Sequence, residues 1–176
     1  YYYAYLLSET NALNQTTSTA YDYTLGQPVS VTDANGAKTG AAYDSLGRMT
    51  AVCAPGDWDG INPCSTSNGA TLQIAYSNYA AGTPFHISLS QKLDASRSMQ
   101  ATRYYGGTGK LIQEQTLNAD VNGGQANIVT AWLYDGLGRL TRQTKPFTYT
   151  GAEAYQTVSF EQDVTITAYD ILSRPV

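Results

Sequence analysis

An eight-residue motif occurs twice in the chain, almost letter for letter. Residues 43–50 read Tyr-Asp-Ser-Leu-Gly-Arg-Met-Thr, and residues 134–141 read Tyr-Asp-Gly-Leu-Gly-Arg-Leu-Thr. A match of this length between distant segments indicates an internal repeat. A repeat restricts the chain to architectures in which one small structural unit recurs along the sequence.

Weaker copies of the motif begin at Tyr21, Tyr105 and Tyr169, and a degenerate copy begins at Tyr76. The spacing between the lead tyrosines varies, so the motif is constant while the segments between its copies are not. The residues that we expect to define the structural repeat are Tyr21, Asp22, Gly26, Tyr43, Asp44, Gly47, Arg48, Tyr105, Gly109, Tyr134, Asp135, Gly138, Arg139, Tyr169, Asp170 and Arg174.

The motif has the composition of a hairpin corner between two strands. An aspartate at the first turn position can accept hydrogen bonds from backbone N–H groups further along the turn. Gly47 and Gly138 can adopt the positive φ that closes a type I turn followed by a bulge. Arg48 and Arg139 then lie within reach of the motif's own tyrosine ring for a cation–π contact across the turn. The aspartates and arginines are therefore predicted to be structural.

The segments between the corners have the character of strands. Tyrosine supplies 15 of the aromatic residues, and Thr, Ser, Asn, Gln and Gly are abundant, which favours strands and tight turns over helices. Residues 128–134 alternate in the way of a half-buried strand, with Trp132 expected in the core. Residues 91–105 have some helical composition, but their alternation predicts a strand. The sequence thus predicts an all-β ribbon of antiparallel strand hairpins.

With Val31–Gly36 following the first copy, the motif Tyr-Asp-x-x-Gly-Arg-[Leu/Met]-Thr resembles the YD repeat of Rhs proteins, toxin-complex cocoon proteins and teneurins. The resemblance extends from about Tyr21 to Val176. It implies a β-sheet strip that spirals into a hollow shell and encloses a toxin domain or, in teneurins, supports cell–cell adhesion. The Asp-Pro-x-Gly-Leu signature of Rhs autoproteolysis is absent from this sequence, so self-cleavage is not expected of any residue here.

The length of 176 residues, or 19.0 kDa, fits one domain spanning residues 1–176. We expect this domain to be a fragment of a larger repeat protein, because it begins with Tyr1 in strand-like sequence and its last motif copy ends at Val176. An open strip leaves two unpaired edges that favour association. Either the remainder of the same shell or identical subunits are therefore expected to pair with these edges.

Two functions remain open at this stage. The first is a structural segment of a shell that encapsulates or presents a toxin or effector domain. The second is an extracellular adhesin or fibre-forming surface protein whose subunits pair strand to strand. Both are non-catalytic, and both suit a secreted or cell-surface bacterial protein.

Charge and hydropathy exclude other classes of partner. Ten Lys and Arg stand against 14 Asp and Glu, a formal net charge of −4, which leaves no basic surface for nucleic acid. No apolar run reaches the roughly 20 residues of a membrane-spanning helix. Toxin cargo and a surface glycan remain possible partners, with Trp58 expected to be an exposed platform for a sugar.

No group of residues predicts catalysis. His86 is the sole histidine, and Ser88 or Ser90 would share its strand face, but no nucleophile motif accompanies them. The motif aspartates recur at one turn position and are predicted to form corners rather than a catalytic pair.

Cys53 and Cys64 flank a loop and are expected to form a disulfide if the protein is exported, with free buried thiols as the alternative. Two cysteines cannot complete a zinc site. Residues 57–62 and 118–123 resemble calcium loops but lack the acidic residue of the twelfth position. We therefore predict no metal site and no cofactor.

Overall fold

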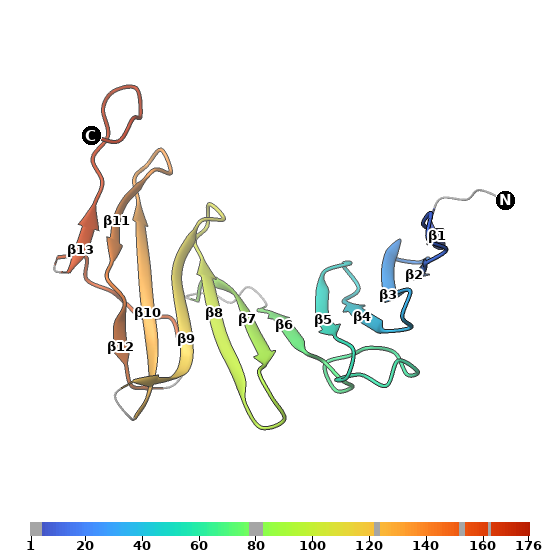
Figure 1. Ribbon diagram of the computed structural model, residues 1–176. Coiled ribbons are helices and arrows are strands. Elements are labelled where there is room, and N and C mark those ends of the chain that lie inside the picture. Colours follow the sequence, from blue (N-terminus) through green and yellow to red (C-terminus); the bar gives the residue numbers. More distant parts are fainter. Residues whose placement is uncertain (1–4, 78–82, 122–123, 152–153, 162) are drawn as a thin grey trace. The chain divides into compact units, whose positions relative to one another are not determined.

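The computed structural model describes residues 5–77, 83–121, 124–151, 154–161 and 163–176. Within these ranges the chain contains strands and no helix, and the strands form one open antiparallel sheet (Figure 1). This confirms the all-β prediction. The degenerate motif copy at Tyr76 continues into residues 78–82, which lie outside the described ranges.

Thirteen strands occur in the described part of the chain, and they follow one another in the sheet in sequence order from β1 to β11 and then β13. β12 also pairs with β10. Their bounds are β1 Ser8–Thr10, β2 Thr16–Asp22, β3 Gln27–Thr32, β4 Lys38–Tyr43, β5 Met49–Cys53, β6 Leu72–Tyr76, β7 Phe85–Lys92, β8 Ser98–Tyr105, β9 Leu111–Val121, β10 Gly124–Tyr134, β11 Leu140–Thr144, β12 Phe147–Tyr149 and β13 Val164–Ile166.

The strand register shifts at the motif tyrosine in the copies that begin at Tyr21, Tyr43, Tyr105 and Tyr134. A bulge places one extra residue in one of two paired strands and increases their local twist. The turn with a bulge that the motif predicts is therefore a recurring feature of the sheet.

The chain divides into two compact units. Unit 1 comprises Tyr1–Ile74 and Ser90–Arg97. Its core is small and consists of the buried Ala51, Cys53 and Cys64, against which Trp58 and other partly buried residues pack. That residues 1–176 form a single domain stays a prediction.

Unit 2 comprises Ala75–Leu89 and Ser98–Val176. Its buried face contains Tyr104, Val129 and Ala131 together with polar side chains. The expectation that Trp132 is core was wrong, because Trp132 is only partly buried while its neighbour Ala131 is 2% exposed. The opposite face of β10 is the buried one. The buried polar side chains of this unit are Thr102, Gln113, Gln115, Asn127 and Thr144.

Residues 91–105 are not helical. β7 ends at Lys92, a turn around Asp94 follows, and β8 begins at Ser98. The strand interpretation of this segment is confirmed, and the turn separates two strands where the sequence suggested one.

Candidate functional site: the linked hairpin corners

The carboxylate of Asp135 organises the corner between β10 and β11. Its Oδ1 accepts hydrogen bonds from the backbone N–H groups of Leu137 and Arg139, each at 2.9 Å. Its Oδ2 accepts from Nε of Arg139 at 2.7 Å. The main chain closes the same turn, because the N–H of Gly138 donates to the carbonyl of Asp135 at 2.9 Å. One side chain thus satisfies several donors of a short turn.

The corners at Asp44 and Asp170 have the same geometry. In each, Oδ1 accepts from two backbone N–H groups at 2.9 Å and Oδ2 accepts from the arginine Nε at 2.7 Å. Gly47 and Gly138 have φ of +75° and +77°, the left-handed conformation that glycine adopts without steric cost. Ser173 takes this position in the last copy with φ of +62°.

Two copies depart from this geometry. In the first copy the glycine follows the aspartate by four residues instead of three, and the N–H of Gly26 donates to the carbonyl of Asp22 at 2.7 Å. In the copy that begins at Tyr105, Gly106 replaces the aspartate, yet its N–H donates to the carbonyl of Lys110 at 2.8 Å. The main chain can therefore form the corner without a carboxylate.

Equivalent corners occur at the other ends of the strands, where the sequence motif did not predict them. Asp33 Oδ1 accepts from the N–H groups of Asn35 and Ala37 at 2.9 and 2.8 Å, and Gly36 has φ of +82°. At the corner before β2, Asn11 Oδ1 accepts from the N–H groups of Leu13 and Gln15 at 2.9 and 3.0 Å. The signal that could have revealed them is an Asp or Asn followed three residues later by Gly or Asn.

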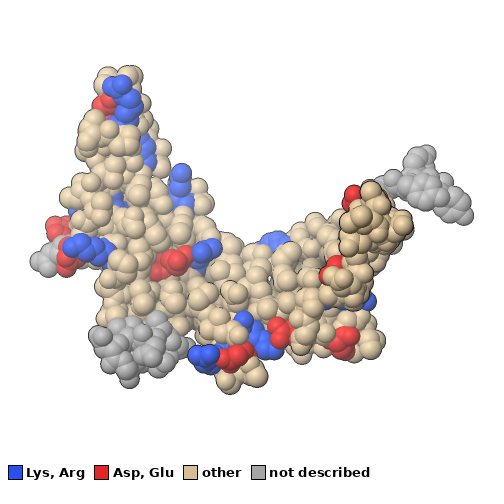
Figure 2. Space-filling view, in the orientation of Figure 1, with Lys and Arg blue, Asp and Glu red and all other residues tan. Residues whose placement is uncertain are grey.

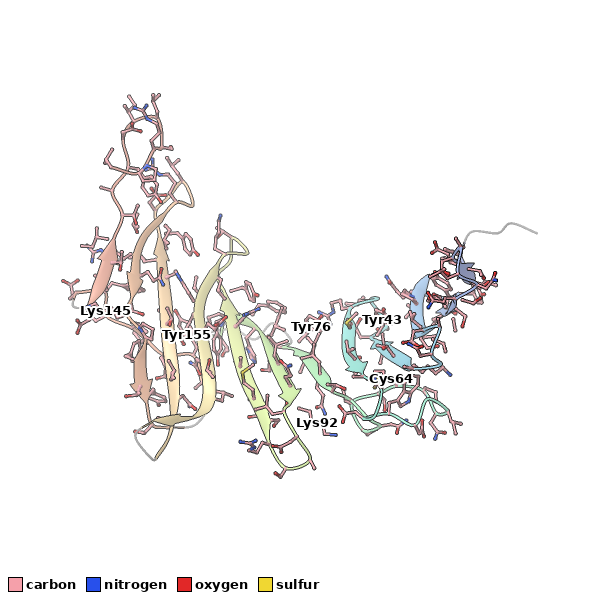
Figure 3. The ribbon with its side chains drawn as sticks, viewed as in Figure 1. Tyr43, Cys64, Tyr76, Lys92, Lys145 and Tyr155 are labelled. Carbon is pink, nitrogen blue, oxygen red and sulfur yellow. A yellow bond between two sulfur atoms is a disulfide. The ribbon has the colours of Figure 1, made fainter. Side chains whose placement is uncertain are left out.

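The motif tyrosines connect consecutive corners. The hydroxyl of Tyr134 donates to the carbonyl of Leu111 at 2.9 Å, and that of Tyr169 donates to the carbonyl of Leu140 at 2.9 Å. In both cases the acceptor is the second residue after the glycine of the preceding corner. Tyr43 in unit 1, labelled in Figure 3, follows the same rule and donates to the carbonyl of Pro28 at 3.0 Å.

The cation of one corner lies over the tyrosine ring of the next. The guanidinium carbon of Arg139 is 4.8 Å from the ring centre of Tyr169, and Lys110 Nζ is 5.8 Å from that of Tyr134. We expected the arginine over the ring of its own motif. Asp135 holds both Nε and Nη2 of Arg139, and Nη1 donates to Ser173 in the following copy of the repeat at 3.1 Å.

Hydrogen bonds within the corners lower the pKa of Asp135 and of Asp170. The backbone N–H of Arg139 lowers the pKa of Asp135, desolvation opposes this, and the guanidinium of Arg139 adds to the lowering. The N–H and guanidinium of Arg174 lower the pKa of Asp170, and the charge of Arg139 lowers it further. A carboxylate with a lowered pKa stays ionised at neutral pH and is therefore a poor general acid there.

In unit 1, Cys53 and Cys64 are joined by a disulfide with an S–S distance of 2.04 Å (Cys64 is labelled in Figure 3). The Trp58 ring packs so closely on Gly40 that a Cβ there would lie 2.8 Å from it. Trp58 Nε1 also donates to the carbonyl of Asn62 at 2.8 Å. Trp58 is therefore half-buried, not exposed as we expected of a sugar platform.

The remaining candidate residues have ordinary protein partners. The His86 ring lies 5.2 Å from that of Tyr104, and Ser88 Oγ lies 3.3 Å from Thr102 Oγ1. Asp57, in the first calcium-like stretch, pairs with Lys92. The second stretch, residues 118–123, includes side chains outside the described ones. Among the described residues no group of three or more His, Cys, Asp or Glu could hold a metal ion.

In the described ranges the chain has no helix of the length and hydropathy needed to cross a bilayer. The face of the molecule in Figure 2 is mostly uncharged, and its acidic and basic side chains are intermingled. The visible surface therefore offers no large basic area, in keeping with the acidic composition.

Two family models match the sequence. Residues 24–55 match the RHS Repeat, and residues 77–173 match a domain of unknown function, DUF6443. No curated protein matches the chain.

Several solved structures have a similar fold. The crystal structure of TcdB2-TccC3 aligns with 97% of the chain with a TM-score of 0.71 and 18% identity. That of TcdB2-TccC3-TEV aligns with 99% of the chain with a TM-score of 0.76 and 13% identity. TcdB2-TccC3 without its hypervariable C-terminal region aligns with 97% with a TM-score of 0.68 and 13% identity.

The chain spans only 11% to 13% of the length of these three chains. At such low identity the likeness shows a shared fold. Together, the repeated corners, the open antiparallel sheet and the two family matches show that the chain belongs to the YD-repeat, or Rhs-repeat, family, with residues 77–173 in the family described as DUF6443.

Proposed function

We propose that the chain is a structural segment of the wall of an Rhs-type shell and has no catalytic role. The observation that carries this proposal is the connection between consecutive corners. Tyr169 binds the carbonyl of Leu140 beside the preceding corner, while Arg139 of that corner lies over the Tyr169 ring. Because each copy contacts the one before it, the same unit can be added many times without a new type of contact.

The strand order supports a wall that continues in both directions. In the described part of the chain, β1 stands at one end of the order and β13 at the other. Unpaired strand edges invite pairing with further strands. In this proposal the remainder of the same shell supplies those strands.

The proposed cargo is a toxin or effector domain. One similar structure is described as lacking a hypervariable C-terminal region, and a variable domain attached to a repeated wall fits an enclosing role. A secreted or cell-surface bacterial location fits as well, because disulfides such as that of Cys53 and Cys64 persist in oxidising compartments.

The experiment that tests the proposal is electron cryo-microscopy of the polypeptide purified from its native source. The proposal expects β1 and β13 to pair with strands of the same chain inside a closed wall that surrounds additional protein density. Pairing of these edges with separate copies in an open filament would reject the shell and favour the adhesin or fibre function.

A further inference from the structure

Residues 154–160, which we call the strap, cross the buried face of unit 2 without regular secondary structure. Two fully buried glutamines of β9 hold its main chain. Gln115 Nε2 donates to the carbonyl of Ala154 at 2.7 Å, and Gln113 Nε2 donates to the carbonyl of Gln156 at 2.9 Å. No sequence pattern indicated this arrangement.

Two further side chains hold main-chain carbonyls, one at Gly151 before the strap and one at Phe160, its last residue. Asn127 Nδ2 in β10 donates to the carbonyl of Gly151 at 3.3 Å, and Arg142 Nη1 in β11 donates to the carbonyl of Phe160 at 2.9 Å. Side chains from three adjacent strands thus form a row of donors directed at one peptide backbone.

The row has the spacing of an extended chain. Gln113 and Gln115 are two residues apart on β9, and they bind carbonyls that are also two residues apart, in the reverse order. Side chains on one face of a strand repeat every two residues. The backbone N–H of Gln156 also donates to Gln113 Oε1 at 2.9 Å, so this amide both donates and accepts, as a neighbouring strand would.

The side chains of the strap alternate between exposed and partly buried, with Val158 and Phe160 among the partly buried ones. Ala154 and Thr157 are exposed, and Tyr155, labelled in Figure 3, is 39% exposed although its ring lies 5.5 Å from that of Tyr104. Hollows of about 590 and 510 Å³ flank the strap. The first is lined in part by His86 and Tyr155. At Ala154 and Gln156 the strap is therefore held mainly by main-chain hydrogen bonds.

One buried acceptor beneath the strap is unsatisfied. Gln115 is 0% exposed, and its Oε1 has no hydrogen-bond partner among the described residues. A buried acceptor without a donor costs stability. An occupant that places one more N–H at this point would bind better than the strap does.

We infer that a binding site for an extended polypeptide is formed by the row of Asn127, Gln115, Gln113 and Arg142. This site recognises the main chain of its ligand, and the strap occupies it. When the strap leaves, the site accepts another extended segment with little regard to sequence. Under the proposed function, an extended segment of the enclosed domain is the occupant, but the site itself does not depend on the chain being part of a shell.

The test uses the variant Gln156→Pro, which removes the N–H that Gln113 accepts and leaves the row of donors intact. A fluorescent peptide with the sequence of residues 150–161 is titrated against this variant by anisotropy. We expect saturable binding, and binding about 10-fold weaker when Gln113→Met is added, since Nε2 and Oε1 of Gln113 each lose one hydrogen bond to the peptide. Gln73→Met is the matched control, because Gln73 lies in β6 and donates to Thr66.

A second measurement needs no further variant. A peptide N-methylated at the position of Gln156 should bind about 10-fold more weakly to Gln156→Pro, and alanine at the positions of Tyr155 and Thr157 should change binding less than about 3-fold. Equal binding of the N-methylated peptide would overturn the inference. Absence of saturable peptide binding would overturn it too, because this variant weakens the strap's own hold and leaves the row of donors intact.

Discussion

The guanidinium carbon of Arg139 lies 4.8 Å from the ring centre of Tyr169, one repeat further along the chain. The same guanidinium donates to Asp135 in its own corner at 2.7 Å and to Ser173 in the next at 3.1 Å. A residue that shapes one turn therefore also positions the tyrosine of the following copy. This coupling makes the stability of each corner depend on its neighbour.

Loss of the tyrosine hydroxyl should weaken the connection between corners. Tyr134→Phe keeps the ring but leaves the carbonyl of Leu111 without its donor at 2.9 Å, so we expect the free energy of unfolding in urea to fall by about 1 kcal/mol. Tyr23, which is 67% exposed, provides the control variant Tyr23→Phe. An equal loss in both variants would show that the Tyr134 hydroxyl has no special role.

The two glycines of one corner should respond differently to alanine. Gly138 has φ of +77°, so Gly138→Ala should lower the free energy of unfolding by about 1–2 kcal/mol through backbone strain. Gly136 has open space where a Cβ would stand, and Gly136→Ala should change it by less than about 0.5 kcal/mol. Urea titrations of the two variants make the comparison. A smaller loss at Gly138 than at Gly136 would contradict this account of the turn.

Acid should remove the contribution of the corner aspartates. Hydrogen bonds from Arg139 hold the pKa of Asp135 below its ordinary value of 3.8. The ionised Asp135 carboxylate therefore stabilises the fold when the pH is above about 3.8. The contribution is lost as the pH falls through the folded-state pKa. Asp135→Asn should therefore melt at a lower temperature than the wild type near neutral pH, with a difference that shrinks below about pH 4. A difference that stays constant down to about pH 2 would mean that the carboxylate charge does not contribute.

Reduction of the disulfide should destabilise unit 1. The bond between Cys53 and Cys64 spans a sequence separation of 11, and closing a loop of this size contributes about 3 kcal/mol in the chain-entropy model. We expect dithiothreitol to lower the melting temperature of the wild type and to leave that of the Cys53→Ser, Cys64→Ser double variant unchanged. If the reductant lowers both equally, its effect does not come from this bond.

Local features of the fold could be predicted from the sequence, while contacts between distant residues could not. A corner is defined by the few residues between an aspartate and a glycine, so Asp44 and Gly47 indicate a turn without any knowledge of the rest of the chain. The strap depends on Gln113 and Gln156, which are 43 residues apart. No local pattern pairs two such residues.

The misplaced tryptophans show the same limit. Alternation predicts that Trp132 and its neighbours face opposite sides of β10, but it does not say which side is covered. The strap covers the side of Val129 and Ala131, so small residues are buried there and the tryptophan is not. Likewise, the packing of Trp58 on Gly40 results from a loop whose course the sequence does not specify.

The claim that this chain is one segment of a continuous wall is tested most directly by the intact mass of the native polypeptide, measured under denaturing and reducing conditions. The account predicts a mass many times the 19.0 kDa of these 176 residues, because one covalent chain supplies the further repeats. A mass near 19.0 kDa would contradict it, and separate subunits would then have to pair with the edges of the sheet.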